Sequence, residues 1–197
     1  HSLLCSCLNN NARSKMTTTS KDEFVDRMNS CNARRNALLQ QFKEASRPFI
    51  DAQRTDLTAS LTNAAAAARE CEAVAKQLEL EHGVALCGEM AASLELALLE
   101  LRFGPVPHGD DVDAIVHGYA SVVQQLNSAA RVFNQYGDKA SLSRSLQLLA
   151  LAYRRATTHD DEIRVLDALV ELDRTDQRVV ALCDAYGRAI DHIFRVG

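Results

Sequence analysis

Residues 84–103 read VALCGEMAASLELALLELRF, and this stretch decides the fold class. Its leucines and Met90 dominate the segment, with Glu89, Glu95 and Glu100 between them. In a helix the apolar side chains would share a broad face, with the three glutamates outside it. The sequence therefore predicts a helix here, and we expect it to be the most buried helix of the chain.

The composition of the whole chain favours long helices. Its 197 residues include 29 alanines and 25 leucines, but only eight glycines, three prolines and no tryptophan. Alanine and leucine are strong helix formers, and scarce glycine and proline leave few tight turns. No segment shows the sustained alternation typical of a strand. We therefore predict an all-α fold, and the composition excludes a disordered chain, a collagen-like repeat and a β-sandwich.

Apolar residues recur at spacings of three and four on both sides of this central stretch and predict seven helices. We expect these helices at residues 22–46, 48–82, 84–103, 110–136, 142–156, 163–172 and 179–196. Ser20 is the expected N-cap of the first helix, Pro48 separates it from the second, and Gly83 ends or kinks the second. The segment GPVPHG at 104–109 is the clearest loop.

The first 20 residues differ from the rest and predict an extended arm. Residues 1–21 contain no aspartate or glutamate and are rich in serine, threonine and asparagine. This composition is typical of organelle-import sequences, so we expect a mitochondrial location in preference to a cytoplasmic one. An expression remnant or a true start at Met16 are the alternatives. After the arm we expect a long-helix bundle at 21–103 and helical hairpins at 110–197, or one continuous domain.

Two segments of the C-terminal half are similar to each other. LALAYRRA at 149–156 and LCDAYGRA at 182–189 share five of eight residues at an offset of 33, and Tyr119 lies 34 residues before Tyr153. This spacing, with Ala150 and Tyr153 on a first helix and Leu166 on a second, resembles the tetratricopeptide repeat. A second register, with Phe133 on a first helix, competes with this one.

The chain also departs from the repeat pattern. Glu162 stands where the family keeps a small residue, and Arg174 replaces the closing proline. The resemblance implies a stack of antiparallel helical hairpins with a concave groove for a partner helix or peptide. The same resemblance implies that exposed first-helix positions line the groove, and Arg154, Arg155 and Arg188 then suggest an acidic partner.

No motif indicates an enzyme, a cofactor or a metal. The ExxH at 79–82 and the Asp113/His117 pair have metal-ligand spacing, but a di-iron bundle needs a second ExxH. His159 is followed by three acids at 160–162, which fall in the first turn of a helix, where acids complement the helix dipole. Neither GxSxG nor a glycine-rich phosphate loop occurs. We expect no catalysis, no cofactor and no small-molecule ligand.

Charge and cysteine content argue against nucleic-acid binding, a membrane span and a disulfide-rich fold. The net charge of −4 gives no footprint for nucleic acid, and no apolar run is long enough to span a membrane. A basic cluster at Arg27, Arg34, Arg35 and Lys43 is expected to be solvated or paired with neighbours such as Asp26 and Glu44. The six cysteines have no CxxC spacing, and we expect reduced, half-buried core thiols.

These observations predict a non-catalytic accessory subunit of a larger assembly that acts as a helical protein–protein interaction scaffold. Its expected partners are other protein subunits. The alternative is a free-standing adaptor that resembles tetratricopeptide proteins and binds peptides transiently.

Overall fold

The computed structural model describes the backbone of residues 2–44, 51–104, 112–156, 158–173 and 175–196. Side chains are described within these ranges except at 2–19, 51–53, 112–114, 176, 190 and 193–196. Seven helices and no strand occur in these ranges, which confirms the predicted all-α class. The helices are α1 Ser2–Glu44, α2 Asp51–Gln77, α3 Glu81–Phe103, α4 Val112–Tyr136, α5 Lys139–Arg155, α6 His159–Leu172 and α7 Asp176–Val196.

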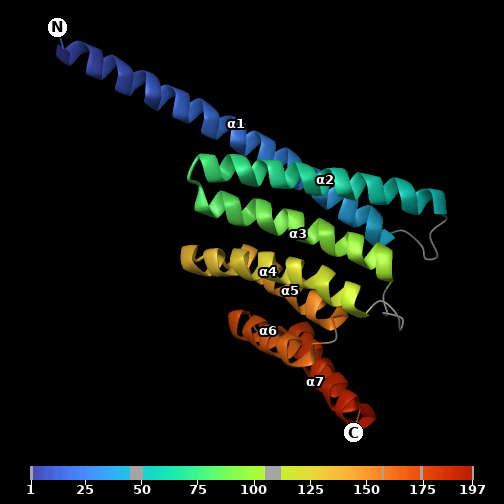
Figure 1. Cartoon of the computed structure of the whole chain (residues 1–197). Coiled ribbons are helices and arrows are strands. Elements are labelled where there is room, and N and C mark those ends of the chain that lie inside the picture. The colour runs from blue at the N-terminus through green and yellow to red at the C-terminus, as the bar shows by residue number, and fades with distance from the viewer. Residues whose placement is uncertain (1, 45–50, 105–111, 157, 174, 197) are drawn as a thin grey trace.

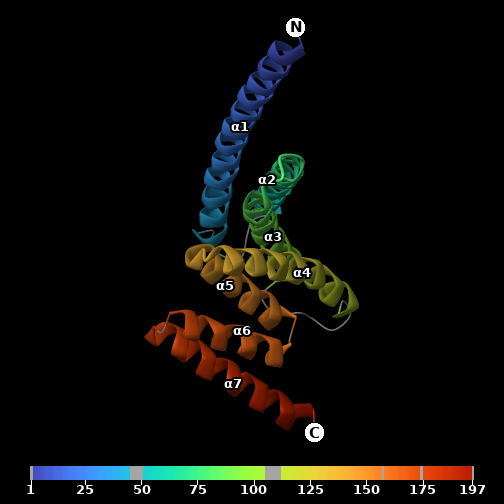
Figure 2. The same cartoon turned by 90° about the vertical axis from the view of Figure 1, so that its left-hand side faces the viewer.

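The helices form a stacked array in chain order (Figure 1). Each helix contacts the next one along the chain, and α3 also contacts both α1 and α5. The N-terminal part of α1 extends beyond the ends of α2 and α3, and α7 closes the opposite end of the array (Figures 1 and 2). No described helix combines the length and apolarity that a membrane span requires.

Helix α3 is the centre of the array, as its composition predicts. Thirteen of its 23 residues are buried. Its side chains belong to three separate apolar clusters. Ala92 and Leu96 pack with α4 and α5, and Met90 packs with α1 and α2. Leu94 belongs to a third cluster, which lies nearer the start of α2. Because α3 is covered on nearly every side, hydrophobic burial stabilises it more than any other helix.

Two of the glutamates expected outside α3 are in fact buried. Glu89 and Glu100 lie inside the array, whereas Glu95 is half-buried and pairs with Arg69 of α2. The prediction was wrong because α3 has no broad polar face, so some charged positions face other helices. Each buried carboxylate pairs with arginines from neighbouring helices, as described below.

The stretch predicted as an extended arm, residues 1–20, is instead helical from Ser2 onwards. Ser20 therefore lies inside α1 and is not an N-cap. Residues 2–44 contain neither glycine nor proline, and extending an existing helix costs less than starting one. The helix accordingly continues through a stretch that lacks apolar periodicity.

The turn between α2 and α3 also differs from the prediction. Helix α2 ends at Gln77, and Glu79 rather than Gly83 takes the left-handed conformation, with φ of 56°. The amide of Leu80 donates to the Ala75 carbonyl (2.9 Å), which closes a Schellman turn. Gly83 lies buried in α3, where a Cβ would come within 3.0 Å of the Phe24 ring. Its function is to admit that ring.

The other boundaries follow the prediction more closely. Gly137, with φ of 69°, ends α4 by the same kind of turn, and the Asp138 carboxylate caps α5 by accepting from the Ser141 amide (3.0 Å). Helices α5, α6 and α7 each begin three or four residues earlier than expected, because their first turns are polar and carry no apolar periodicity. Pro48, most of the 104–109 loop and Arg174 lie outside the described residues.

Candidate functional site

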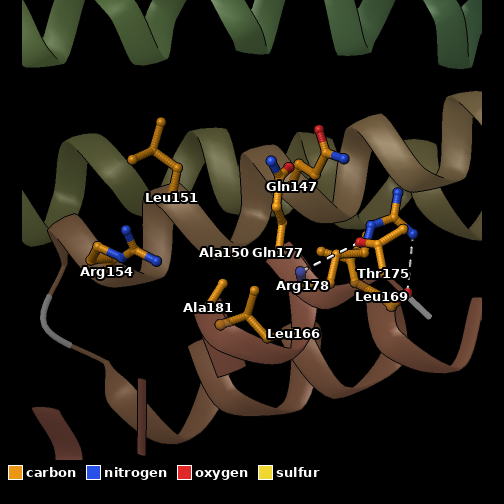
Figure 3. Close-up of a pocket in the computed structure, with 10 residues that line it drawn as sticks. All are labelled: Gln147, Ala150, Leu151, Arg154, Leu166, Leu169, Thr175, Gln177, Arg178 and Ala181. Carbon is orange, nitrogen blue, oxygen red and sulfur yellow. Dashed lines mark hydrogen bonds between the residues drawn. The ribbon is translucent and has the colours of Figure 1, made fainter. Parts of the chain in front are cut away.

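An open groove of about 500 Å³ lies between α5 and α7 (Figure 3). Both helices pack against α6, which forms the floor, whereas within the described part of the chain the backbones of α5 and α7 do not pack against each other. The groove is lined by Gln147, Ala150, Leu151, Arg154, Leu166, Leu169, Thr175, Gln177, Arg178 and Ala181. Its lining combines an apolar floor with amide and guanidinium groups, which suits an amphipathic ligand.

Helical spacing explains why these side chains meet. Gln147, Ala150, Leu151 and Arg154 lie on one face of α5, because residues three, four and seven apart are neighbours along a helix. Ala150 is buried against α6 together with Leu166 and Leu169, and its small side chain allows the close approach. The floor is therefore part of an apolar cluster that α5, α6 and α7 build together, and the polar groups lie on the walls.

The two arginines of the groove have different surroundings. Arg178 donates from Nη1 to the carbonyl oxygens of Leu169 (3.2 Å) and Asp173 (3.0 Å) and from Nη2 to Ser143 Oγ (2.9 Å). Arg178 therefore satisfies the C-terminal end of α6, where a cation is favourable. Arg154 stands at the other end of the groove (Figure 3), and its side chain is 38% exposed. Within the described chain its Nη1 and Nη2 atoms make no hydrogen bond, so they are available to a ligand.

The three arginines predicted to line the groove pair with buried glutamates of the chain itself. Arg154 Nε and Arg188 Nη2 each lie 2.7 Å from Glu162 Oε1, and Arg155 Nε lies 2.8 Å from Glu100 Oε1. Of the three, only Arg154 lines the groove. The arginines that recur in the two similar segments therefore neutralise buried glutamates of the chain itself.

Glu162 is the most enclosed of these carboxylates. Its side chain is 0% exposed, and its Oε2 atom, His159 Nδ1 and Arg188 Nε are buried with no hydrogen-bond partner among the described residues. His159 Nδ1 lies 4.0 Å from Glu162 Oε2, and the His159 ring stacks obliquely near His192 (5.3 Å). The residue that departs from the repeat pattern is thus the centre of the charge cluster that joins α5, α6 and α7.

A second set of buried pairs joins α3 to α5. Glu89 accepts from Arg144 through both oxygens (3.3 and 3.1 Å), and Glu100 accepts from Arg155. The two glutamates are eleven residues apart, and so are the two arginines, so each pair lies on one face of its helix. This matched spacing was visible in the sequence, although apolar periodicity alone does not reveal it.

Tyr119 lies buried beside the Glu100–Arg155 pair. Burial, and secondarily the nearby Glu100 carboxylate, raise the pKa of Tyr119 to about 12. The phenol therefore remains protonated at neutral pH.

The motifs with metal-ligand spacing do not converge in the structure. Glu79 lies within the α2–α3 turn, whereas His82 lies in the first turn of α3 rather than at a helix C-terminus, and its Nε2 atom contacts Asp138 (3.1 Å). His117 is exposed on α4, and the Asp113 side chain lies outside the described residues. The described residues contain no cluster of three or more histidine, cysteine or acidic side chains that could hold a metal.

The cysteines and the basic cluster of α1 also have defined positions. Cys71 and Cys87 are buried, which confirms the prediction for these two, but Cys183 is exposed, because it lies on the open face of α7. Cys5 and Cys7 have no described side chains. Burial raises the pKa of Cys71 to about 11 and of Cys87 to about 12.

The basic residues of α1 pair with other helices rather than with the neighbours that the sequence suggested. Arg27 pairs with Glu70 of α2 (2.6 Å), and Arg35 is buried against Glu89 of α3 (3.4 Å). Arg34 and Lys43 are exposed.

Comparison with protein-family models, curated proteins and solved structures finds no match to this chain. The tetratricopeptide resemblance therefore stays a prediction, and the functional argument rests on the groove and the charge pairs.

Proposed function

We propose that this protein is a non-catalytic helical scaffold, an accessory subunit of a larger assembly, and that it binds a protein partner in the groove between α5 and α7. The groove is the observation that carries the proposal. A stack of hairpins held by neighbour contacts leaves an extended open surface where two helices share a third as their floor. Such a surface accepts a helix or an extended peptide.

The groove chemistry suggests the character of the partner segment. Leu151, Leu166 and Ala181 offer apolar contact along the floor and walls. Arg154 and the two glutamines, Gln147 and Gln177, offer hydrogen-bond donors at the edges, and a guanidinium favours a carboxylate. The best-fitting segment has apolar residues on one side and an aspartate or glutamate that reaches Arg154.

Helix α1 supports the proposal that the protein belongs to a larger assembly. Its N-terminal part extends beyond the helices that pack against its C-terminal part (Figures 1 and 2). A helical segment without neighbours is only marginally stable in water, so a partner subunit would stabilise it. A mitochondrial assembly is the preferred location within this proposal, on the acid-free composition of residues 1–21. Cell fractionation would test it.

Purification of the tagged chain from its own cells, followed by quantitative mass spectrometry, tests the scaffold proposal. The informative variant is Gln147→Glu/Gln177→Glu, because both side chains are exposed on the groove walls and the added charges repel an acidic segment. The matched control is Gln41→Glu/Gln135→Glu, which adds the same charge at exposed positions outside the groove.

We expect partners at a fixed ratio, reduced about tenfold or more by the groove variant and retained by the control. Recovery of the chain alone, or equal recovery with both variants, would contradict the groove assignment. A shifting set of partners at low level, still sensitive to the groove variant, would favour the free-standing adaptor.

A further inference from the structure

A cavity of about 330 Å³ lies between α1, α3 and α5, separate from the α5–α7 groove. Its polar wall is formed by Asn29, Asn32 and Arg35 of α1, Glu89 of α3 and Arg144 of α5. This volume falls at the lower end of the range in which proteins bind small molecules.

The charges of this wall do not balance. The Glu89 carboxylate is 1% exposed and faces two guanidinium groups, those of Arg35 (Nη1, 3.4 Å) and Arg144 (Nη2, 3.1 Å). One carboxylate against two arginines leaves one excess positive charge. Burial lowers the pKa of Arg35, Glu89 opposes that shift and Arg144 adds to it, yet an arginine stays protonated at neutral pH. The buried Arg35 pairs with Glu89, so the excess charge lies on Arg144, whose side chain is 44% exposed, and a bound carboxylate would pair with this guanidinium.

Hydrogen-bond donors are also in excess. The Asn36 side-chain oxygen accepts from both Nε and Nη2 of Arg35 (3.1 and 3.0 Å), which fixes that guanidinium in the wall. Within the described chain, Arg144 Nη1 and the side-chain amides of Asn29 and Asn32 have no partner. A ligand that contributes acceptors therefore fits this wall.

The remaining wall is apolar. Met28, Leu86 and Met90 line it, and methionine side chains adapt readily to ligands of different shape. The cavity thus combines donor-rich, positively charged groups with apolar side chains in one lining.

We propose that this cavity binds a small organic monocarboxylate, whose carboxylate group accepts from Arg144 and the asparagine amides while its apolar body lies against Met28, Leu86 and Met90. One carboxylate neutralises the excess charge, whereas a phosphate dianion would exceed it. The sequence predicts no small-molecule ligand, because the cavity residues come from three helices and only the fold brings them together.

Isothermal titration calorimetry of the full chain at constant ionic strength tests the proposal. Benzoate and hexanoate are the probes, and benzamide and hexanamide are their neutral counterparts. We expect both carboxylates to bind with a Kd of about 1 mM or tighter, and the amides to bind about tenfold more weakly or worse.

Asn32→Asp is the decisive variant, because Asn32 is exposed at the cavity wall and the change adds a negative charge without removing a partner of Glu89. We expect it to weaken carboxylate binding about tenfold or more, with helical content by circular dichroism unchanged. Asn63→Asp, at an exposed position of α2 outside the cavity, is the matched control and should bind like the natural chain. Arg144→Gln, at a 44%-exposed side chain, should weaken binding as well.

Three results would overturn the proposal. They are the absence of binding for both carboxylates, equal binding of acids and amides, and unchanged affinity in Asn32→Asp. Binding of inorganic phosphate without either carboxylate would overturn the assigned ligand class.

Discussion

The side chain of Glu162 is surrounded by three helices, and its charge is neutralised by arginines from two of them. A buried carboxylate contributes little net stability when paired, but removing it leaves its partners uncompensated. Arg154 and Arg188 are each about one-third exposed, so water relieves part of that cost.

We expect Glu162→Ala to lower the free energy of unfolding by about 2–3 kcal/mol, because it leaves two guanidinium groups unpaired and opens a void. Urea denaturation measures this change. Asp161→Ala is the adjacent control, since Asp161 makes only a surface pair with Arg164, and it should change stability by less than about 0.5 kcal/mol. Equal effects of the two substitutions would contradict the buried role of Glu162.

The thiols of Cys71 and Cys87 give the fold a defined response to alkaline pH. Their folded-state pKa values of about 11 and 12 lie above the ordinary thiol value. Because the folded pKa is raised, the stabilising contribution is complete below about pH 8.5 and is lost as pH rises towards the folded values.

We therefore expect the free energy of unfolding to fall between about pH 8.5 and pH 11, by about 2 kcal/mol for each buried thiol at pH 10. Urea midpoints at pH 7.5 and pH 10 measure it. Cys87→Ala should reduce the fall, whereas Cys183→Ala, at an exposed thiol, should leave it unchanged. A pH-independent midpoint would contradict the raised pKa values.

At the scale of helices, the two Schellman turns make a natural comparison. The turn after α4 uses Gly137, whereas the turn after α2 places Glu79 in the same left-handed region. A side chain in that conformation costs about 1 kcal/mol relative to glycine, part of which the greater freedom of unfolded glycine offsets.

Glu79→Gly should therefore raise the free energy of unfolding by about 0.5–1 kcal/mol. Thermal unfolding followed by circular dichroism measures the shift in Tm. Gly137→Ala is the mirror experiment and should lower stability by about 1 kcal/mol. A loss of stability in Glu79→Gly would show that the glutamate side chain contributes more than its backbone conformation costs.

The existence of the helices and several of their C-terminal ends, such as Phe103, Tyr136 and Leu172, were predictable from the sequence, whereas most helix starts and the charge pairs were not. Periodicity reports apolar residues, so it located the body of α5 but missed its first turn, which Asp138 caps. For the same reason it placed Glu89 and Glu100 outside, since an arginine that neutralises a buried glutamate lies 55 residues away in the chain. Of the groove, the sequence indicated Arg154, but the apolar floor depends on how α6 packs between α5 and α7.

Across the whole molecule, stability should decrease from the centre to the C-terminal end. Helix α3 packs against four other helices, whereas within the described chain the backbone of α7 packs against α6 alone, and Arg178 of α7 reaches α5 by a hydrogen bond to Ser143. Val180 and Tyr186 of α7 are each at least half exposed. In an array held by neighbour contacts, the terminal helix opens at the lowest free energy.

We expect amide hydrogen exchange in α7 to be about tenfold or more faster than in α3. Arg188→Gln should accelerate exchange in α7 further and leave α3 unchanged, because Arg188 joins α7 to Glu162. Mass spectrometry of peptic fragments measures both. Uniform protection across the helices would indicate that the array opens as one cooperative unit.

The equal eleven-residue spacing of the α3–α5 pairs has a mechanical consequence. A shift of α5 along α3 by one turn, about 5.4 Å, would bring Arg144 and Arg155 opposite Ala85 and Leu96 in one direction, or Ser93 and Gly104 in the other, and none of these positions carries a charge. Both ion pairs would have to break in the same event, so a shearing force along the helix axes is shared between two anchors in parallel. The layer of α3 and α5 should therefore resist shear, and α6 and α7, which lie outside this doubly anchored layer, should bend first.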